Sequence, residues 1–554
     1  MAIENKPKRL ESLKDRDFDL IIIGGGVVGA GIARDAALRG LKVALFEKAD
    51  FGSGTSSRST RLIHGGLRYL EMLDFGLVRQ DLKEREILLR IAPHLVRPLA
   101  FLVPFYNRNL FYRLKLLIGM YLYDWLSFDK SLPNHKAFNK KQTLELEPAL
   151  RAEGLQGATL YYDGQVALAE RLCLENILAA QAEGALCFNH MEVTGVIKVA
   201  NRVVGVKLRD TLSGAEGEAR ARLVINAVGP WLDGLEEKLI GHASHRVRRT
   251  KGIHFTAPPV VNNAVVLFAE SDNRLFFVIP WLGYAWVGTT DTDFEGDLDQ
   301  VQADRSDVEY LLESVKEIFP QADWQTIYYT NAGVRALVRR TSKTGAEESA
   351  VSRKHALIDH QKTEQIEGLL SVVGGKLTAY RGIAEEAVDQ VTKKLGLQVK
   401  GRSGEELLPG GATGDPEVYL RTLQPEATRY GLTTKQTEYL VSVYGSRVLE
   451  IFELLKSDPT LAQPIHPAYP DIRAELRFAV ERESCLTLSD FMMRRTALYF
   501  TPDQGEQAAL NASFELAALL GWSIEERQHQ EAAYAQELSW TQNWTSLSSQ
   551  SVGR

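Results

Sequence analysis

The chain has 554 residues, 45% of them hydrophobic and 25% charged, with a formal net charge of −6. This length allows two or more domains with sizeable cores, and the slightly acidic balance gives no reason to expect a nucleic-acid partner. Three cysteines, Cys173, Cys187 and Cys485, follow neither a metal-ligand spacing nor a disulfide framework, which favours a reducing, cytoplasmic compartment. We expect neither a signal peptide nor a membrane-spanning segment, because no stretch has the apolar character that either requires.

Residues 18–47, FDLIIIGGGVVGAGIARDAALRGLKVALFE, predict a unit that binds a dinucleotide. An apolar strand over 20–23 leads into three glycines with G-x-G-x-x-G spacing, then into a helix over 28–39 and a second strand over 43–46. Glu47 ends the second strand. A lone glycine motif is weak evidence, because loops also use glycine for turns. Here strand, helix, second strand and acid occur in the order that such a site requires.

Each part of this unit has a physical role in holding a dinucleotide. Gly24 allows the tight turn, Gly26 lets backbone N–H groups approach a pyrophosphate, and Gly29 lets the helix pack close to the strand. The N-terminus of the helix faces the negative charge of the phosphates. Glu47 can accept hydrogen bonds from ribose hydroxyls.

The following segment, 51–71, reads FGSGTSSRSTRLIHGGLRYLE and is dense in glycine, serine and threonine. Small hydroxyl side chains suit a backbone that wraps around a cofactor. The two glycines beside His64 and Arg68 suit the close approach of a flat ring or a substrate. A polar surface loop is the alternative, but leucine and isoleucine residues interrupt the run and favour a partly buried path.

Residues 97–123, RPLAFLVPFYNRNLFYRLKLLIGMYLY, combine basic, aromatic and aliphatic side chains and contain no acid. This composition suits the surface of an anionic membrane, with the rings at the depth of the lipid headgroups. The alternative is a helix that packs into a substrate domain and keeps its basic residues in solvent. Periodicity does not separate the two interpretations.

The nucleotide-binding part continues with a predicted helix over 167–184 and strands over 202–209 and 219–226. Between the helix and these strands, the backbone near Val193 is available to the edge of an adenine. The last strand ends in residues that let the chain pass close to a cofactor, namely Ala227, Gly229 and Trp231.

The second half of the chain changes character twice. Residues 241–330 contain several short apolar runs and predict an antiparallel domain inserted between nucleotide-binding segments. Residues 331–400 are expected to return to the cofactor. The run 401–416 is rich in glycine and proline and marks a boundary, and residues 417–540 predict helices.

Five motifs give the chain a resemblance to a known family. They are SSRSTRLIHGGLRYLE (56–71), KGIHF (251–255), GTTDTDFEG (288–296), AGVRAL (332–337) and GGKLTAYR (374–381). Over about the first 400 residues, their content and order resemble the FAD-dependent glycerol-3-phosphate dehydrogenases of the aerobic, respiratory type. The remainder resembles, more loosely, the helical C-terminal domain of that family.

The resemblance implies an α/β fold: a Rossmann-like FAD-binding domain with an inserted antiparallel substrate domain of the glycine-oxidase and amino-acid-oxidase type, plus a helical C-terminal domain. The expected division is an oxidoreductase domain over 1–403 and the helical domain over 404–554. Within the first domain, FAD-binding segments are expected at about 18–96, 160–240 and 331–400. Substrate-domain segments are expected at about 97–159 and 241–330.

The resemblance also implies a cofactor, FAD, and a reaction. The reaction is the oxidation of sn-glycerol 3-phosphate to dihydroxyacetone phosphate in glycerol catabolism, with electrons passed to membrane quinone. The protein is then expected in the cytoplasm, on the inner face of the cell membrane, with residues 97–123 against an anionic lipid surface; a homodimer is compatible with this. Two alternatives stay open: a glycerophosphate oxidase that uses O₂, and a flavin-binding sensor with little turnover.

The reaction requires cations for the phosphate, a base for the C2 hydroxyl and an acceptor for the C2 hydride. Arg335 and Lys376, each in a glycine-rich motif, are predicted to bind the substrate and to act in catalysis. Arg68 and Tyr69 are predicted substrate contacts. His254 is predicted to bind the substrate and act as the base, because imidazole titrates near neutral pH, with His64 as the second choice for the base. No metal is expected, since a flavin carries the redox step.

The residues predicted to contact FAD come from all the nucleotide-binding motifs above. They are Gly24, Gly26, Gly29, Glu47, Ser56, Ser57, Thr60, Leu62, His64, Val193, Ala227, Gly229, Trp231, Gly333, Gly375, Lys376, Leu377 and Thr378. Lys376 and Thr378 are expected at the N-terminus of a helix, where the helix dipole can stabilise negative charge on a reduced ring.

Overall fold

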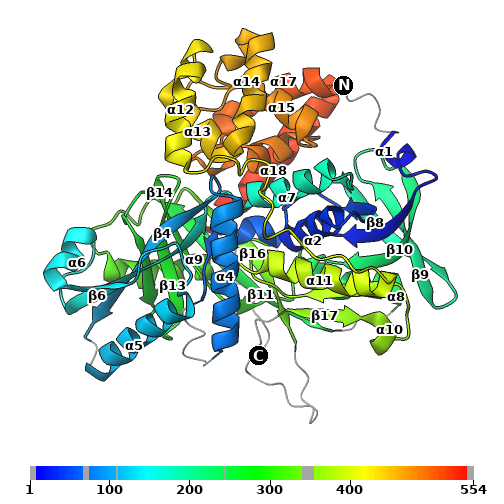
Figure 1. Ribbon diagram of the computed structural model, residues 1–554. Coiled ribbons are helices and arrows are strands. Elements are labelled where there is room, and N and C mark those ends of the chain that lie inside the picture. The colour runs from blue at the N-terminus through cyan, green and yellow to red at the C-terminus, as the bar shows by residue number, and fades with distance from the viewer. Residues whose placement is uncertain (1–7, 67–73, 108–109, 242–244, 340–354, 546–554) are drawn as a thin grey trace.

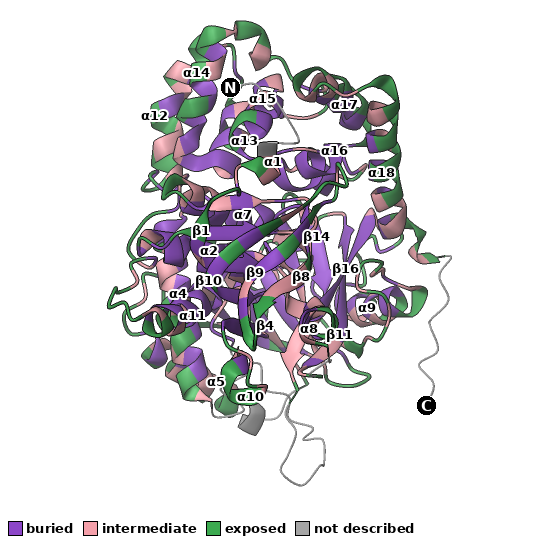
Figure 2. Ribbon diagram, turned by 90° about the vertical axis from the view of Figure 1, so that its right-hand side faces the viewer, coloured by how far each residue is buried: buried purple, intermediate pink, exposed green. Residues whose placement is uncertain are grey.

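The computed structural model describes residues 8–66, 74–107, 110–241, 245–339, 355–545 of the chain. Two sheets lie side by side, and a group of helices from the C-terminal part of the chain covers one end of both (Figure 1). The strands of the two sheets are largely buried, whereas the outer faces of the C-terminal helices are exposed (Figure 2). The sheet nearer the N-terminus carries the dinucleotide motif.

This first sheet has eight strands with a parallel centre. Its order is β17 (Ala356–Asp359), β18 (Leu369–Val373), β10 (Glu216–Asn226), β1 (Asp17–Ile23), β2 (Val43–Phe46) and β7 (Leu186–Phe188), with β9 (Arg202–Asp210) on β10 and β8 (Met191–Val199) on β9. From β18 to β7 all neighbours are parallel. The carboxyl ends of these strands therefore meet at one edge, where doubly wound sheets bind ligands.

Three helices cover one face of this sheet: α2 (Val27–Leu38), α7 (Ala169–Ala182) and α11 (Tyr380–Leu395). Helix α2 packs between the other two helices. Small residues in α2 make this close packing possible. A Cβ on Gly31 would lie only 2.9 Å from the ring of Tyr380. The helix predicted over 28–39 and the strands predicted over 20–23 and 43–46 are confirmed by α2, β1 and β2.

The second sheet has ten strands and is antiparallel apart from one pair. Its order is β15 (Thr292–Asp293), β11 (Val247–Ala257), β14 (Tyr284–Gly288), β13 (Leu275–Trp281), β12 (Ala264–Phe268), β4 (Val96–Tyr106), β6 (Leu155–Val166) and β3 (Leu62–Ile63), with β16 (Tyr329–Val338) on β11 and β5 (Lys136–Asn139) on β6. The parallel pair is β12 and β4. Strand β16 begins the segment predicted to return to the cofactor, yet it pairs with β11 along ten residue pairs.

The basic and aromatic segment 97–123 is divided between a strand and a helix. Its first part is β4, in which Phe101, Val103 and Phe105 face one hydrophobic core and Leu102 faces another. This alternation has the two-residue period of a strand. The second part belongs to α5 (Leu110–Leu126), which packs beside α4 (Phe75–Ile91) at the outside of the molecule (Figure 1). Only the helical part therefore offers a continuous outer surface.

The remaining elements cover the sheets and build the C-terminal part. They are α1 (Lys8–Glu11), α6 (Lys140–Leu146), α8 (Leu232–Ile240), α9 (Arg305–Ile318), α10 (His360–Thr363), α12 (Pro416–Arg429), α13 (Thr434–Tyr444), α14 (Val448–Ser457), α15 (Arg473–Arg482), α16 (Leu488–Asp490), α17 (Glu506–Leu520) and α18 (Ile524–Gln542). The helices predicted beyond residue 416 are thus present. In the described ranges, no helix is both long and apolar enough to cross a bilayer.

Candidate active site

A cavity of about 710 Å³ is lined by residues from both sheets. Some lining residues come from the glycine loop after β1, the end of β2 and the end of β10. Others come from β11, β16 and the loop before α11. Its volume is typical of a cofactor or small-molecule site, and its position follows the rule for ligands at the carboxyl ends of parallel strands.

The glycine loop after β1 fits a dinucleotide. Gly24 has φ +104°, and a Cβ there would lie 2.9 Å from the carbonyl oxygen of Ala227, so only glycine can occupy this turn. A Cβ on Gly29 would lie 2.0 Å from the carbonyl oxygen of Gly24, which explains the close contact of helix and strand. Gly26 is the N-cap of α2, and no side chain caps the helix from that position.

Glu47 is fixed by the backbone at the end of β2. Its Oε2 accepts a hydrogen bond from the Gly25 N–H (2.7 Å) and its Oε1 accepts one from the Ala49 N–H (2.9 Å). Burial raises the pKa of Glu47, and these two hydrogen bonds oppose the increase. A carboxylate has further lone pairs, so Glu47 retains the capacity to accept ribose hydroxyls.

Most of the residues predicted to bind the cofactor line this one cavity. They are Gly24, Gly26, Glu47, Ser56, Thr60, Leu62, His64, Val193, Ala227, Gly229, Trp231, Gly333, Gly375, Lys376, Leu377 and Thr378. Gly29 and Ser57 are not among the lining residues: Gly29 packs against the loop, and the Ser57 hydroxyl donates to the carbonyl of Gly54. Arg68 and Tyr69 lie outside the described residues. A contact of any of these groups with FAD stays a prediction.

Arg335 projects from β16 and is held against the neighbouring strands. Its guanidinium donates to the hydroxyl of Thr289 (2.8 Å) and to the carboxylate of Asp291 (3.1 Å). A Cβ on Gly252 would lie 2.2 Å from Arg335 Nη2. Because Gly252 of the motif KGIHF has no side chain, it leaves the space in which Arg335 of the motif AGVRAL lies.

His254 is buried in the cavity wall and is neutral at physiological pH. Its ring stacks on Trp286 with 4.9 Å between centroids, and its Nε2 lies 3.0 Å from the hydroxyl of Thr60. Burial, together with the charges of Arg335 and Arg61, holds the pKa of His254 well below its usual value. A Cβ on Gly288 would lie 2.3 Å from the imidazole, so the first glycine of GTTDTDFEG makes room for it.

Lys376 lies in the loop before α11 and forms an ion pair with Asp81 of α4. In the same loop, the Thr378 hydroxyl accepts a hydrogen bond from the His64 N–H (3.0 Å). Both residues precede Ala379, the N-cap of α11, so the structure places them at the N-terminus of this helix, as expected. The loop thus joins the segment around His64 to the cavity wall.

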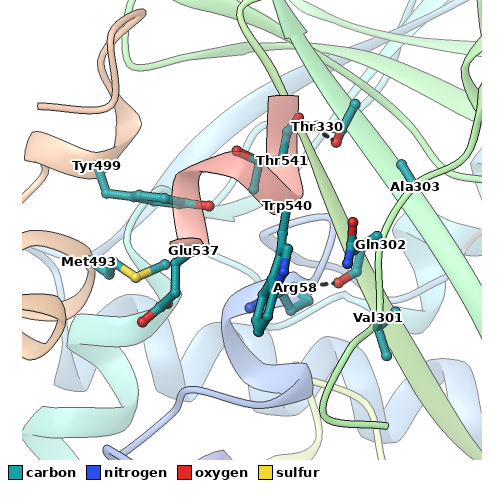
Figure 3. A pocket seen from close by; sticks show the side chains of 11 residues that line it. Arg58, Val301, Gln302, Ala303, Thr330, Met493, Tyr499, Glu537, Trp540 and Thr541 are labelled. Atoms are coloured by element: carbon teal, nitrogen blue, oxygen red, sulfur yellow. Dashed lines mark hydrogen bonds between the residues drawn. The ribbon is translucent and has the colours of Figure 1, made fainter. Parts of the chain in front are cut away.

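The lining residues that were not predicted from the sequence include Arg58, Arg249 and Trp540. The two arginines lie in or beside recognised motifs, and their charge was a usable signal. Trp540 comes from α18, and nothing in its sequence context indicates a site. Around a smaller adjoining hollow, Trp540 and Glu537 lie near Arg58 (Figure 3). There the hydroxyl of Thr330 donates to the Thr541 carbonyl (2.8 Å). The C-terminal helices therefore contribute to the wall of the cavity.

Comparison with known proteins defines the class first. The family described as FAD dependent oxidoreductase matches residues 19–390, and the family described as C-terminal domain of alpha-glycerophosphate oxidase matches residues 403–527. A glycerol-3-phosphate dehydrogenase from Synechocystis sp. is 40% identical over 547 residues, covering 95% of this chain and 97% of that protein. The fold and the matched family both define an FAD-dependent oxidoreductase, so FAD is the cofactor.

Further comparisons narrow the class. The structure of a glycerol-3-phosphate dehydrogenase from Bacillus halodurans complexed with FAD has a TM-score of 0.78 and 29% identity, covering 96% of this chain and 97% of that one. An alpha-glycerophosphate oxidase from Streptococcus pyogenes is 33% identical, covering 95% of this chain and 96% of that protein. The chain belongs to the family of FAD-dependent glycerol-3-phosphate dehydrogenases.

Proposed function

We propose that the protein oxidises sn-glycerol 3-phosphate to dihydroxyacetone phosphate and passes the electrons to membrane quinone. One observation carries the assignment: Arg335, His254 and Lys376 line the same cavity as the glycine loop. Two cations and a neutral imidazole in one cavity suit a phosphorylated secondary alcohol. The names of the relatives, glycerol-3-phosphate dehydrogenase and alpha-glycerophosphate oxidase, support the same substrate.

The oxidation removes a proton from the C2 hydroxyl and a hydride from C2, which leaves a ketone. FAD, when bound, supplies the acceptor for the hydride. Arg335 and Lys376 bind the phosphate and orient C2. His254 takes the hydroxyl proton at Nε2, directly or through the hydroxyl of Thr60, which lies 3.0 Å away. Burial lowers the pKa of His254, so this nitrogen is unprotonated at neutral pH, as a proton acceptor must be.

The first test is an anaerobic visible spectrum of the holoprotein before and after addition of glycerol 3-phosphate. Bleaching of the flavin bands by this compound, but not by glycerol or glycine, is the expected result. Bands that stay unchanged would remove the substrate assignment and favour a flavin-binding sensor. If the flavin is reduced, its reoxidation by a soluble quinone analogue is compared with reoxidation by O₂. Faster reoxidation by O₂ would favour the glycerophosphate oxidase.

The outer face of α5 supports a membrane acceptor. Leu114, Ile118, Tyr121 and Trp125 recur at helical spacing and are 52 to 69% exposed, and Phe128 just beyond the helix is 77% exposed. Isolated apolar side chains are common on surfaces, but a contiguous stripe indicates an interaction site. A helix of this kind lies in the plane of a lipid interface with its apolar face inserted.

The membrane assignment is tested by sedimentation with vesicles. The double variant Ile118→Glu and Trp125→Glu is expected to lose binding to vesicles that contain anionic lipid, because two charges enter the apolar face. Phe514→Glu, an equally exposed aromatic position on α17, is the control and should bind as the wild type does. Unchanged binding of the double variant would remove α5 as the membrane contact and leave the FAD chemistry unaffected.

A further inference from the structure

A structural role in α4 does not explain the environment of the Asp81 side chain. The side chain is fully buried, and its Oδ2 accepts the ammonium of Lys376. Its other oxygen, Oδ1, is buried and has no hydrogen-bond partner within the described part of the chain. An ion pair with one unsatisfied oxygen is poor evidence for stabilisation, since burial of a charge costs more than a single contact returns.

The neighbouring acids are bound differently. Glu84, one turn further along α4, receives two hydrogen bonds from the guanidinium of Arg381. Asp163 of β6 receives one from Arg85 and one from the hydroxyl of Tyr123. Both acids are therefore matched by arginines inside the protein. Asp81 is matched by a lysine that lines the cavity.

We propose that Asp81 positions Lys376 at the cavity wall and sets the charge next to the flavin ring. With Asp81 ionised, the pair is close to neutral; removal of that carboxylate adds one unit of positive charge beside the cavity. This inference rests on the proposed function only in placing the flavin ring beside Lys376. It makes Asp81 a positioning residue that acts through Lys376, because no contact of Asp81 with the cavity is needed.

The consequence is electrostatic. Reduction by a hydride adds negative charge to the bound flavin, and a nearby cation stabilises that charge in a low-dielectric site. The Asp81 carboxylate reduces this stabilisation and so lowers the midpoint potential. Burial raises the pKa of Asp81 to about 6, against the opposing effect of Lys376, with Glu84 and Asp163 contributing to the increase. Among the described residues, the charges with the largest effect on Asp81 are Lys376 in the loop before α11, Glu84 of α4 and Asp163 of β6. Arg381 and Arg85 neutralise the two acids.

The test is the midpoint potential of the bound flavin, measured by equilibration with redox dyes at pH 8 and pH 5. Asp81→Asn should shift the equilibrium toward the reduced form about tenfold at pH 8, which is about 30 mV for a two-electron couple. The shift should shrink at pH 5, where the wild-type carboxyl is protonated. Asp81→Glu should restore the wild-type potential. Asp129→Asn removes the same charge from an exposed carboxylate that binds Arg79 of α4, and should leave the potential unchanged.

A purely structural role would give another result. Asp81→Asn would then lose FAD or thermal stability, and the potential of the protein that retains FAD would match the wild type at both pH values; that outcome overturns the proposal. If the Asp81→Asn protein retains no FAD, Lys376→Met is measured in its place. Loss of this cation should lower the midpoint potential of the flavin at pH 8, and an unchanged potential would overturn the proposal. None of these readings uses glycerol 3-phosphate, so a failed substrate assignment is recognised separately.

Discussion

The cavity wall and the contact between the two halves of the molecule use similar charged residues in opposite ways. At the contact, Asp50 follows the end of β2 and is fully buried. Its Oδ2 accepts from Arg494 Nε (2.6 Å) and Arg495 Nη1 (2.6 Å), and its Oδ1 accepts from Arg495 Nη2 (2.9 Å). At the cavity, by contrast, two buried atoms lack a partner in the described ranges: Nδ1 of the lining residue His254, and Oδ1 of Asp81, which binds the lining residue Lys376.

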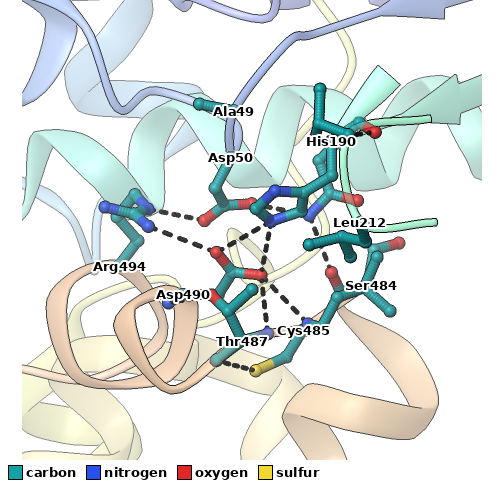
Figure 4. A network of polar contacts seen from close by, with 12 residues as sticks. Ala49, Asp50, His190, Leu212, Ser484, Cys485, Thr487, Asp490 and Arg494 are labelled. Carbon is teal, nitrogen blue, oxygen red and sulfur yellow. Dashed lines mark hydrogen bonds and ion pairs between the residues drawn. The ribbon is translucent and has the colours of Figure 1, made fainter. Parts of the chain in front are cut away.

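These ion pairs form a network at the contact between the two halves, the contact network. It also includes a group of residues with the spacing of metal ligands. Ligating atoms of Asp50, His190 and Asp490 lie within 4.8 Å of one another. Figure 4 shows the guanidinium of Arg494 between the two carboxylates, and it bonds both of them. Because arginines already neutralise these acids, we interpret the group as a structural ion network. It attaches the C-terminal helices to the loop that carries Glu47.

The comparison separates attachment from chemistry. The acids of the contact are matched by arginines and fix one segment to another, whereas Asp81 and His254 keep unmet hydrogen-bonding capacity, as groups that handle a ligand or a proton do. Matched substitutions in the two regions should therefore have opposite effects. Variants in the wall should change kinetics at constant stability, and variants in the contact network should change stability at constant kinetics.

The largest kinetic effect is expected for His254→Gln. Loss of a general base slows the chemical step by about 10²- to 10⁴-fold, and stopped-flow reduction of the flavin by glycerol 3-phosphate measures it. In the wild type the rate should not fall between pH 8 and pH 6.5, because the pKa of His254 lies well below its usual value and the imidazole stays neutral. A rate that halves near pH 6.5 would contradict this environment for His254.

Arg335→Met should reduce kcat/KM for glycerol 3-phosphate by about 10²-fold, or about 3 kcal/mol, since a charge-assisted contact to the phosphate is lost. FAD content should stay at the wild-type level. The matched change in the contact network is Arg494→Met, which removes one charge without lining the cavity. It should lower the melting temperature and leave KM unchanged. Equal loss of FAD and substrate use in Arg335→Met would place this arginine at the cofactor.

Glu483 offers the sharpest test of the contact network. Burial by itself would raise the pKa of Glu483, but Arg171 and Arg447 lower it to about 2. A depressed carboxyl pKa contributes stability above the unfolded value of 4.5, and that contribution is lost as the pH falls toward 2. The contribution is about 3 kcal/mol at neutral pH.

Denaturant unfolding of Glu483→Gln should therefore show a deficit in the free energy of unfolding at pH 7. This deficit should narrow steadily as the pH is lowered below 4.5. Glu481→Gln, on the exposed side of α15, is the control and should stay within about 0.5 kcal/mol of the wild type. A deficit that is independent of pH would mean that Glu483 acts through packing rather than charge.

The sequence predicted the glycine loop and its flanking elements far better than the contacts between distant parts of the chain. Strand β1, helix α2, strand β2 and Glu47 follow one another within 31 residues, so local patterns sufficed. The pairing of Asp81 with Lys376 joins positions 295 residues apart, and the pairing of Asp50 with Arg495 joins positions 445 apart. No local pattern records such contacts. The prediction for segment 97–123 used its composition. Composition does not show that successive side chains of β4 face two different cores.

The smallest effect expected here concerns a glycine that the sequence recognised only as part of a motif. Gly252→Ala would put a methyl group 2.2 Å from Arg335 Nη2 and displace the guanidinium without removing it. KM should rise about tenfold, because misplacing a binding group costs less than deleting it. Gly195→Ala in β8, where a Cβ would meet its nearest neighbour at 3.8 Å, controls for the substitution itself. In the Arg335→Met background, Gly252→Ala should have no further effect on KM. An additive effect would show that Gly252 makes room for something other than Arg335.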